Sequence, residues 1–389
     1  MTLKTLLGDI SPDTFLRDYW QQKPLLVRQA LPGFQGHLSG EELAGLALEE
    51  DVESRLVIEQ DGERPWQVKH GPLEEADFLN TPDSHWTLLV QEMNRHLPEV
   101  AEMFDYFAFL PSWRLDDIMI SYADDQGSVG PHVDNYDVFL LQASGTRRWQ
   151  ISNQVIDETD LIPDIEMRIM QGFEAEQEWL LEPGDMLYLP PRLPHYGVAQ
   201  GPCITYSIGF RAPTLHQMWS HFIEYLQQLG EDSFYRDPDM AAVDQSGRIT
   251  PQAQRRVHEM MRSLPLDNET LDEWFGRFIT DPVRGVGPEP LSEDITMEQF
   301  LAPLHAGESL YRSEETRFAY YLADGDIRMY INGQHWDHKG VSPSLIRLIA
   351  DRRHYTADDL AGFTTQFDQA FLLNLHQQGL LGYLESEHD

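Results

Sequence analysis

Residues 113–212 contain a series of short, apolar, strand-like runs, and this pattern restricts the fold more than any other feature of the sequence. The runs are DDIMISYA, YDVFLLQA, RRWQISN, EWLLEPGDMLYLP and CITYSIGFRA, and the turn signals among them are DDQG, ASGT, EPGD and PPRLP. Short strands at regular intervals with turn residues between them are typical of a β-sandwich or a β-barrel. We therefore expect a sandwich or a barrel in the middle of the chain.

Helical patterns lie on both sides of this β-rich region, and 389 residues are enough for two or three domains. Residues 12–22, 40–48 and 85–108 are expected to be helical, with Ser39 as the N-cap of the second helix. Residues 214–278 also have a helical pattern. The Pro- and Gly-containing stretch DPVRGVGPEPLS that follows is typical of a linker or a domain boundary.

The C-terminal part of the chain combines a hairpin pattern with three helical runs. The hairpin is FAYYLADGDIRMYINGQHW, in which the Asp-Gly and Asn-Gly pairs favour tight turns. The helical runs are SPSLIRLIADR, TADDLAG and FDQAFLLNLHQQG. Three short helices with a β-hairpin suggest a winged-helix-like unit, and we divide the chain into domains at 1–213, 214–283 and 284–389.

The chain is strongly acidic, because 65 Asp and Glu residues outnumber 28 Lys and Arg residues and give a formal net charge of −37. Such a field repels nucleic acids and anionic membranes and attracts basic partners. The charge permits a basic protein substrate without requiring one, since acidic surfaces also keep proteins in solution.

Cysteine content and hydropathy restrict the class of protein further. Cys203 is the single cysteine, which excludes an internal disulfide framework and a multi-cysteine zinc site and suits a reducing cytoplasm. No apolar run is long enough to span a bilayer, and MTLKTLLGDISPDTF lacks the apolar core of a signal peptide. We therefore expect a cytoplasmic protein.

Two polar residues interrupt an otherwise apolar segment, GPHVDNYDVFLLQ. His132 and Asp134 alternate along it, and alternate residues of a strand point to the same face, so the two side chains could chelate a metal ion. A third ligand should come from another strand. The best candidate is His195 in EPGDMLYLPPRLPHYGV, where prolines stiffen the backbone directly before the histidine.

Two histidines and one carboxylate leave one side of a metal ion open, which is the arrangement of non-haem Fe(II) oxygenases. The open positions can take a 2-oxo acid and then dioxygen, whereas a structural zinc site has four protein ligands. The alternative for these residues is a buried polar group with ordinary hydrogen bonds. His335 and Asp337 in QHWDH have the same spacing, but they follow an Asn-Gly turn, so we interpret them as part of a surface hairpin.

A dicarboxylic 2-oxo acid also needs a cation for its far carboxylate, and GTRRW follows Asp134 on the next expected strand. Arg147 has the same parity as Trp149, whose ring should pack inside, so Arg147 is expected to face the interior. Arg148 would then face solvent. Ser121 in MISYA could donate its hydroxyl to the same carboxylate. The alternative is that both arginines lie on the surface.

These segments resemble the JmjC-type 2-oxoglutarate oxygenases and, more narrowly, the bacterial ribosomal-protein arginine hydroxylases, relatives of the eukaryotic ribosomal oxygenases. The matching pieces span roughly residues 15–213 and are YWQQKPLLVR, GPHVDNYDVFLLQ, GTRRW, PGDMLYLPPRLPHYG and YSIGFRAP. The resemblance implies an α+β chain with a double-stranded β-helix, the cupin/JmjC jelly-roll. It also implies a helical dimerisation segment, a winged-helix-like C-terminal domain and a homodimer.

The resemblance further implies that His132, Asp134 and His195 bind Fe(II). It assigns Arg147, with Ser121 beside it, to the carboxylate of 2-oxoglutarate, with O2 as the second cosubstrate. The implied reaction is hydroxylation at C3 of an arginine side chain in a basic ribosomal protein, L-sixteen of the large subunit. Possible contacts for the target guanidinium are Asp116, Asp117, Tyr136 and Ser207.

Three other functions are open at this point. A cupin enzyme acting on a small molecule would use the same metal without an anchor such as Arg147. A JmjC-type demethylase would apply the same chemistry to an N-methyl group. A ligand-sensing module with a DNA-binding winged helix could use Arg347, Arg352 and Arg353. The net charge opposes phosphate binding, so we expect no direct DNA binding.

Overall fold

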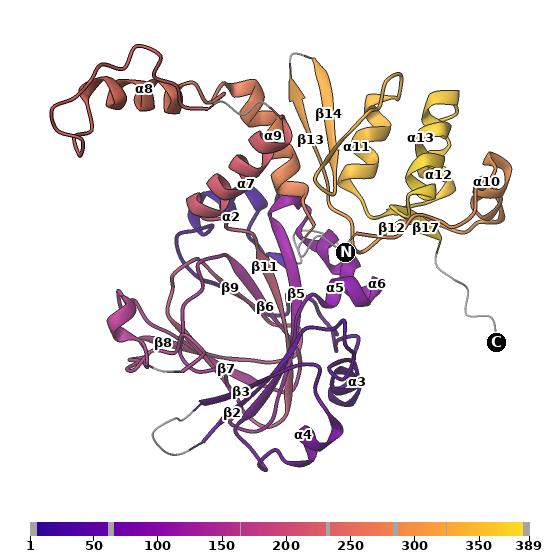
Figure 1. The fold of residues 1–389 in the computed structure, drawn as a ribbon. Coiled ribbons are helices and arrows are strands. Elements are labelled where there is room, and N and C mark those ends of the chain that lie inside the picture. Colours follow the sequence, from indigo (N-terminus) through magenta and orange to yellow (C-terminus); the bar gives the residue numbers. More distant parts are fainter. Residues whose placement is uncertain are drawn as a thin grey trace.

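The structure is a computed structural model that describes residues 6–60, 66–163, 165–230, 234–282, 287–323 and 325–383. Figure 1 shows three parts in chain order: a β-rich part, a helical part, and a C-terminal unit of helices and strands. None of the helices in the described ranges is long and apolar enough to cross a membrane.

The β-rich part consists of two sheets that form the predicted jelly-roll. The larger sheet has eight strands, all paired antiparallel, in the order β1-β9-β6-β11-β5-β4-β2-β3. Their bounds are β1 Leu25–Val27, β2 Ser54–Glu59, β3 Trp66–His70, β4 Trp86–Val90, β5 Leu115–Ala123, β6 Val138–Ser144, β9 Met186–Leu189 and β11 Cys203–Phe210. The smaller sheet has the order β10-β7-β8, with bounds β7 Arg147–Ile151, β8 Gln177–Leu181 and β10 His195–Ala199.

Apolar side chains at alternate strand positions pack the two sheets against each other. Leu140 and Leu187 of the larger sheet belong to the same buried cluster as Trp149 of the smaller sheet. Burial alternates along β7, where Arg147 and Trp149 are buried and Arg148 is exposed. The predicted parity of this strand is therefore confirmed.

Short helices cover the other face of the larger sheet and share its main core. Their bounds are α2 Pro12–Asp18, α3 Gly40–Leu46, α5 Met93–His96 and α6 Pro98–Glu102, with a 3-10 helix, η1, at Met103–Phe107. Another short helix, α4, covers Glu75–Leu79. Phe15 of α2 is fully buried, and its ring centroid lies 5.7 Å from Phe139 and 5.0 Å from Tyr188. Ser39 caps α3 in a capping box with Glu42, as predicted.

The prediction of one helix over 85–108 is wrong for its first part. Residues 86–90, with the sequence WTLLV, form β4, which pairs with β2 and β5 in the middle of the larger sheet. A short apolar run has no periodicity that distinguishes a buried strand from a buried helix. Because the neighbouring strands bury four of its five residues, tertiary pairing decides the outcome.

The helical part contains α7 (Leu215–Gln228), α8 (Pro251–Arg262) and α9 (Asn268–Thr280). A small aromatic core joins α7 to α9 and includes Phe222 and Trp274, whose ring centroids are 5.3 Å apart. No residue of α8 is buried, and Figure 1 shows α8 on an arm that extends away from the rest of the chain.

The C-terminal unit has its own core of apolar side chains around the buried Phe300, Leu345 and Leu375. The predicted hairpin is present as β13 (Phe318–Ala323) and β14 (Asp326–Ile331), followed by β15 (Gln334–Trp336). The helices are α10 Met297–Ala306, α11 Pro343–Asp351, α12 Ala357–Leu360 and α13 Gln366–Gln377; the remaining strands are β12 Leu310–Arg312, β16 His354–Tyr355 and β17 Leu381–Tyr383.

The C-terminal unit packs closely against α9. Gly276 lies against the ring of Tyr330, so close that a Cβ at this position would be 2.4 Å from a ring atom. The hydroxyl of Tyr330 donates to Glu273 of α9 at 2.8 Å. The division at 1–213, 214–283 and 284–389 stays a prediction, and its second boundary lies outside the described residues.

Candidate metal and cofactor site

A cavity of about 420 Å³ opens among the strands of the β-rich part, a volume within the range of small-molecule and cofactor sites. All five residues that the sequence singled out for the metal and the cofactor line it. They are Ser121, His132, Asp134, Arg147 and His195.

The side chains of His132, Asp134 and His195 converge in this cavity. One ligand atom of each lies within 4.8 Å of the ligand atoms of the other two. The Oδ2 atom of Asp134 is 3.6 Å from Nε2 of His195 and 3.9 Å from Nε2 of His132. Two backbone hydrogen bonds between the histidines, each 3.0 Å long, hold their segments together. A single metal ion could therefore contact all three side chains.

His132 and Asp134 lie just before β6, so the prediction that they occupy a regular strand is wrong. His132 forms an isolated bridge with His195, and the backbone N–H of Arg192 donates to the carbonyl of Asp134 at 2.6 Å. Gly130 has a φ of 80°, and a Cβ there would collide with a neighbouring side chain, so this turn requires glycine. Backbone contacts with the segment at residues 192–195, rather than the alternation of a regular strand, bring His132 and Asp134 to the cavity.

The second nitrogen of each histidine ring contacts a backbone carbonyl. Nδ1–H of His132 donates to Gly130 and Nδ1–H of His195 donates to Leu193, both at 2.9 Å. Because a carbonyl can only accept, Nδ1 carries the proton and the lone pair of Nε2 is left for a metal. Burial, and then the neighbouring His132, lower the pKa of His195 to about 4, so this ring is neutral near pH 7. A neutral imidazole is the form that binds metal ions.

Arg147 brings a buried positive charge into the same cavity. Only 4% of the residue is exposed, and its Nη1 donates long hydrogen bonds to the hydroxyls of Ser121 (3.3 Å) and Thr205 (3.4 Å). Its Nε has no partner among the described residues. Burial lowers the pKa of Arg147, but a guanidinium keeps its charge in proteins. The guanidinium also lies 5.4 Å from the ring centroid of Trp149, but no carboxylate partner is found among the described residues. Burying a cation without an opposite charge destabilises the fold unless a ligand carboxylate compensates the charge.

Thr205 is a contact of Arg147 that the sequence reasoning missed. Thr205 is the cross-strand partner of Ser121, and its hydroxyl donates to Gln142 at 3.1 Å, which leaves the oxygen free to accept from Arg147. The sequence CITYSIGF contains a signal for the orientation of Thr205, because Thr205 has the same strand parity as Ser207, one of the predicted substrate contacts.

Three of the four candidate contacts for a substrate guanidinium line the cavity: Asp117, Tyr136 and Ser207. Asp117 is partly buried, and one of its carboxylate oxygens accepts from the backbone N–H of Glu92 at 3.2 Å. Burial, and then the charge of Asp116, raise the pKa of Asp117 to about 6. Its carboxylate is therefore ionised near pH 7 and can accept hydrogen bonds from a cation.

Asp116 does not line this cavity, so its prediction as a substrate contact is wrong. Successive residues of β5 point to opposite faces, and Asp116 contacts Arg317 of the C-terminal unit (3.3 Å) and Arg211 (3.9 Å) instead. The position of Asp116 depends on a part of the chain two hundred residues away, which local sequence does not reveal.

The second His-x-Asp pair has a structural role. His335 lies on β15, and its Nδ1 is 3.1 Å from a carboxylate oxygen of Glu273; Asp337 accepts from the backbone N–H of Lys339. Within the described ranges, His132, Asp134 and His195 form the one group of metal-ligating side chains with suitable spacing.

Cupin and JmjC oxygenases hold two histidines and one carboxylate between the sheets of a jelly-roll, and this chain has that architecture and donor set. The JmjC domain family matches residues 102–218, and the AraC-like ligand binding domain family matches residues 173–274. Within this class, the chain belongs to the family of the bacterial ribosomal oxygenases, whose members are similar to it over most of its length.

Two relatives and one solved structure illustrate the similarity. The ribosomal protein uL16 3-hydroxylase of Escherichia coli K12 is 38% identical over 328 residues, which cover 84% of this chain and 85% of that protein. The probable ribosomal oxygenase of Haemophilus influenzae is 33% identical over 349 residues, covering 86% and 84% of the two chains. The structure of YcfD, a ribosomal oxygenase from E. coli, in complex with cobalt and 2-oxoglutarate has a TM-score of 0.79 at 34% identity. The match covers 96% of this chain and 98% of that one.

Proposed function

We propose that this protein is an Fe(II)- and 2-oxoglutarate-dependent dioxygenase that hydroxylates C3 of an arginine side chain in a large-subunit ribosomal protein. One observation carries the proposal: a single cavity contains both the His132–Asp134–His195 group and Arg147, for which no carboxylate partner is found among the described residues. The E. coli relative named as a uL16 3-hydroxylase supports the substrate class.

The donor atoms fit a ferrous ion. His132 and His195 offer imidazole nitrogens, Asp134 offers a carboxylate oxygen, and three protein ligands leave coordination positions open. When bound, iron and 2-oxoglutarate supply an oxidant for a C–H bond while 2-oxoglutarate is converted with O2 to succinate and CO2.

Arg147, Ser121 and Thr205 would hold the far carboxylate of 2-oxoglutarate. The guanidinium can donate two parallel hydrogen bonds to a carboxylate, and the Ser121 hydroxyl can turn from the Thr205 carbonyl, to which it donates at 3.4 Å, toward the same oxygens. Thr205 donates to Gln142 and supports the guanidinium by accepting from it. Because Arg147 and Ser121 are almost fully buried, water competes poorly for these bonds.

Asp117, Tyr136 and Ser207 form the substrate end of the cavity. The ionised carboxylate of Asp117 would accept hydrogen bonds from the target guanidinium, and binding of that cation would favour the charged form further. Tyr136 is partly exposed, so its ring can contact the aliphatic stem of an incoming arginine. A net charge of −37 favours encounter with a basic ribosomal protein.

Two of the three arginines that a DNA-binding winged helix could use are engaged within the protein. The guanidinium of Arg353 lies 5.1 Å from the ring centroid of Phe104, and Arg352 pairs with Asp359 at 2.7 Å. We therefore expect no direct DNA binding, and a salt-dependent shift of duplex DNA on a gel would contradict this expectation.

We also propose that the protein is a cytoplasmic homodimer joined through the helical part. Apolar side chains of α7 and α8 are exposed to solvent, namely Leu215, Trp219, Ile223, Val257 and Met261. Exposed apolar side chains gathered on neighbouring elements mark interaction surfaces. Light scattering that gives the mass of a single chain at micromolar concentration would contradict the dimer.

Incubation with arginine substrates tests the proposed function. The iron-loaded protein, 2-oxoglutarate and a set of ribosomal proteins are combined in air, and a mass gain of about 16 Da, one oxygen atom, is sought on an arginine. Stoichiometric succinate should accompany the gain. Loss of about 14 Da from an N-methylated arginine would instead indicate demethylation, and turnover without any modified protein would favour a small-molecule substrate.

A further inference from the structure

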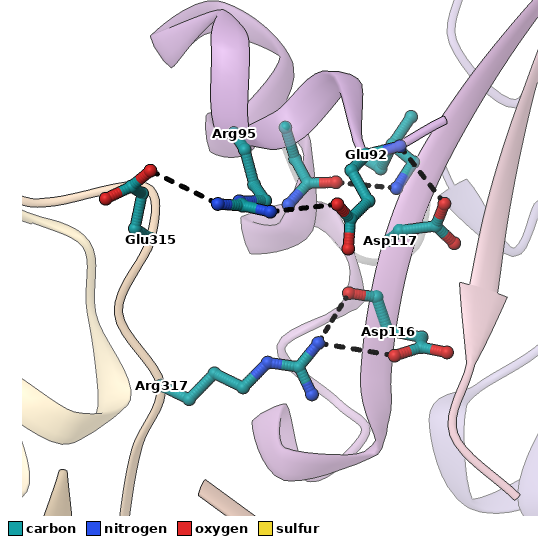
Figure 2. A network of polar contacts seen from close by, with 8 residues as sticks. Glu92, Arg95, Asp116, Asp117, Glu315 and Arg317 are labelled. Atoms are coloured by element: carbon teal, nitrogen blue, oxygen red, sulfur yellow. Dashed lines mark hydrogen bonds and ion pairs between the residues drawn. The ribbon is translucent and has the colours of Figure 1, made fainter. Parts of the chain in front are cut away.

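The N-terminal end of β5 lies where the β-rich part meets the C-terminal unit. Asp116 and Asp117 are consecutive there and face opposite sides: Asp117 lines the catalytic cavity, and Asp116 lines a second, smaller cavity at the junction. Figure 2 shows both residues and the polar side chains that reach them from the two parts of the chain.

Arg317 connects the C-terminal unit directly to Asp116. Its Nη2 donates to the backbone carbonyl of Asp116 at 3.2 Å and to the carboxylate at 3.3 Å (Figure 2). Arg317 immediately precedes β13, and only 21% of its side chain is exposed. A carbonyl contact of this kind fixes the backbone of β5 as well as neutralising a side chain.

Glu315 makes a second connection, through two intermediates. Its carboxylate accepts from Arg95 at 3.2 Å, and Arg95 also donates to the carboxylate of Glu92 at 2.9 Å. Glu92 has a left-handed backbone with a φ of 51°, and its N–H donates to Asp117. Because a residue with a side chain rarely adopts this conformation, the contacts of Glu92 are needed to hold it (Figure 2).

Charged and polar groups from several elements act on Asp117. The negative charges of Asp116 and Glu92 raise the pKa of its carboxyl, and the positive charge of Arg317 lowers it. Arg55 of β2 and Gln91, which follows β4, complete the surroundings of Asp117. In the orientation that satisfies both its nitrogen and its oxygen, the side-chain amide of Gln91 donates to Asp117 at 3.2 Å and accepts from Arg55 at 2.6 Å. Tyr136 hydrogen-bonds to Asp134, and the charge of Asp117 acts on the Tyr136 hydroxyl.

We propose that Arg317 and Glu315 of the C-terminal unit are positioning residues for the substrate end of the cavity. They hold the carboxylate of Asp117 in place through Asp116 and through Glu92. The inference rests on the proposed function, in which Asp117 receives the guanidinium of the substrate. It gives the C-terminal unit an indirect part in substrate recognition, because no residue of that unit lines the catalytic cavity among those described.

Substitution of Arg317 tests the proposal. We expect Arg317→Met to raise KM for an arginine peptide about three- to tenfold, with the KM for 2-oxoglutarate unchanged. Loss of the positive charge also raises the pKa of Asp117, so the acid limb of kcat/KM should move to higher pH. Arg317→Lys should recover much of the loss. Arg352→Met is the matched control, because the ion pair that Arg352 forms among the described residues is with Asp359, inside the C-terminal unit.

Hydrogen exchange followed by mass spectrometry gives a readout that needs no substrate. Arg317→Met and Glu315→Gln should increase exchange in the segments around Glu92 and Asp117, and Arg352→Met should not. An unchanged peptide KM and acid limb in Arg317→Met would overturn the proposal. If the wild-type protein modified no arginine, the proposed function would fail. Unchanged hydrogen exchange around Glu92 in Arg317→Met and Glu315→Gln would separately refute the positioning role.

Discussion

The catalytic cavity and the junction with the C-terminal unit each contain an arginine that is largely withdrawn from solvent, and the two arginines have different partners. Among the described residues, Arg147 in the cavity donates to two hydroxyls and to no carboxylate, while Arg317 at the junction donates to both a carboxylate and a backbone carbonyl. Burying a charge without an opposite charge beside it destabilises the fold, so Arg147 is suited to receive an anionic ligand. Arg317 is already compensated, so it is suited to join two parts of the chain.

The largest effect should follow removal of a metal ligand, which abolishes the function of the cavity and leaves the junction intact. We expect His195→Ala and Asp134→Ala to lose bound iron and to reduce arginine hydroxylation by about a thousandfold or more, roughly 4 kcal/mol. Metal content is measured by mass spectrometry and turnover by succinate release. His335→Ala, from the second His-x-Asp pair, should retain both, and full iron in His195→Ala would contradict the assignment.

Removing the uncompensated arginine should have the next largest effect. Arg147→Met is expected to raise the KM for 2-oxoglutarate about a hundredfold, because a bidentate pair with a carboxylate is lost. Its melting temperature should not fall, since the substitution removes a buried charge that lacks a carboxylate partner. Arg148→Met on the exposed side of β7 provides the control for both measurements. A lower melting temperature with normal 2-oxoglutarate affinity would make Arg147 a structural residue like Arg317.

A smaller effect concerns the pH dependence of kcat/KM, which should depend on Asp117 at the substrate end of the cavity. An ionised Asp117 binds the guanidinium, and its pKa is about 6, so kcat/KM for an arginine substrate should fall as pH drops below 6. Asp117→Asn should lower kcat/KM at pH 7.5 and remove this limb of the profile. Identical pH profiles for the wild type and Asp117→Asn would exclude Asp117 from substrate binding.

The smallest expected effect is on the stability of the folded protein, and its sign follows from the protonation of Asp117. Folding raises the pKa of Asp117 from 3.8 to about 6, so the folded protein binds its proton more tightly than the unfolded chain. The contribution of Asp117 to stability is therefore fully present below pH 3.8 and is lost as pH rises through 6. Asp117→Asn should consequently melt no lower than the wild type at pH 7.5, and a clear decrease would show that its ionised hydrogen bonds stabilise the fold.

The features that follow from local alternation could be predicted from the sequence. The parity of β7, which buries Arg147 and exposes Arg148, depends only on the two-residue period of a strand. A sandwich or a barrel follows from short strands between turns, and the resemblance to JmjC oxygenases narrows it to the jelly-roll, in which His195 lies beside His132.

The features that the sequence could not predict depend on which distant segments become neighbours. The strand at residues 86–90 forms because β2 and β5 flank it, and its own residues are equally compatible with a buried helix. Asp116 was assigned to the wrong side because its partner, Arg317, comes from another part of the fold. The parity of Thr205 follows from CITYSIGF, but its contact with Arg147 depends on the pairing of β11 with β5.

The tandem arginines of β7 have a consequence for how the gene can tolerate insertions and deletions. Loss of one codon directly before this strand, if the strand slipped by one residue, would shift Arg148 into the place of Arg147 and leave an arginine in the cavity. The same shift would turn Trp149 and Ile151 from the core toward water, because a one-residue slip exchanges the two faces of a strand. Length changes should therefore be confined to the loops that flank β7, even though a one-residue slip of the strand would keep an arginine in the cavity.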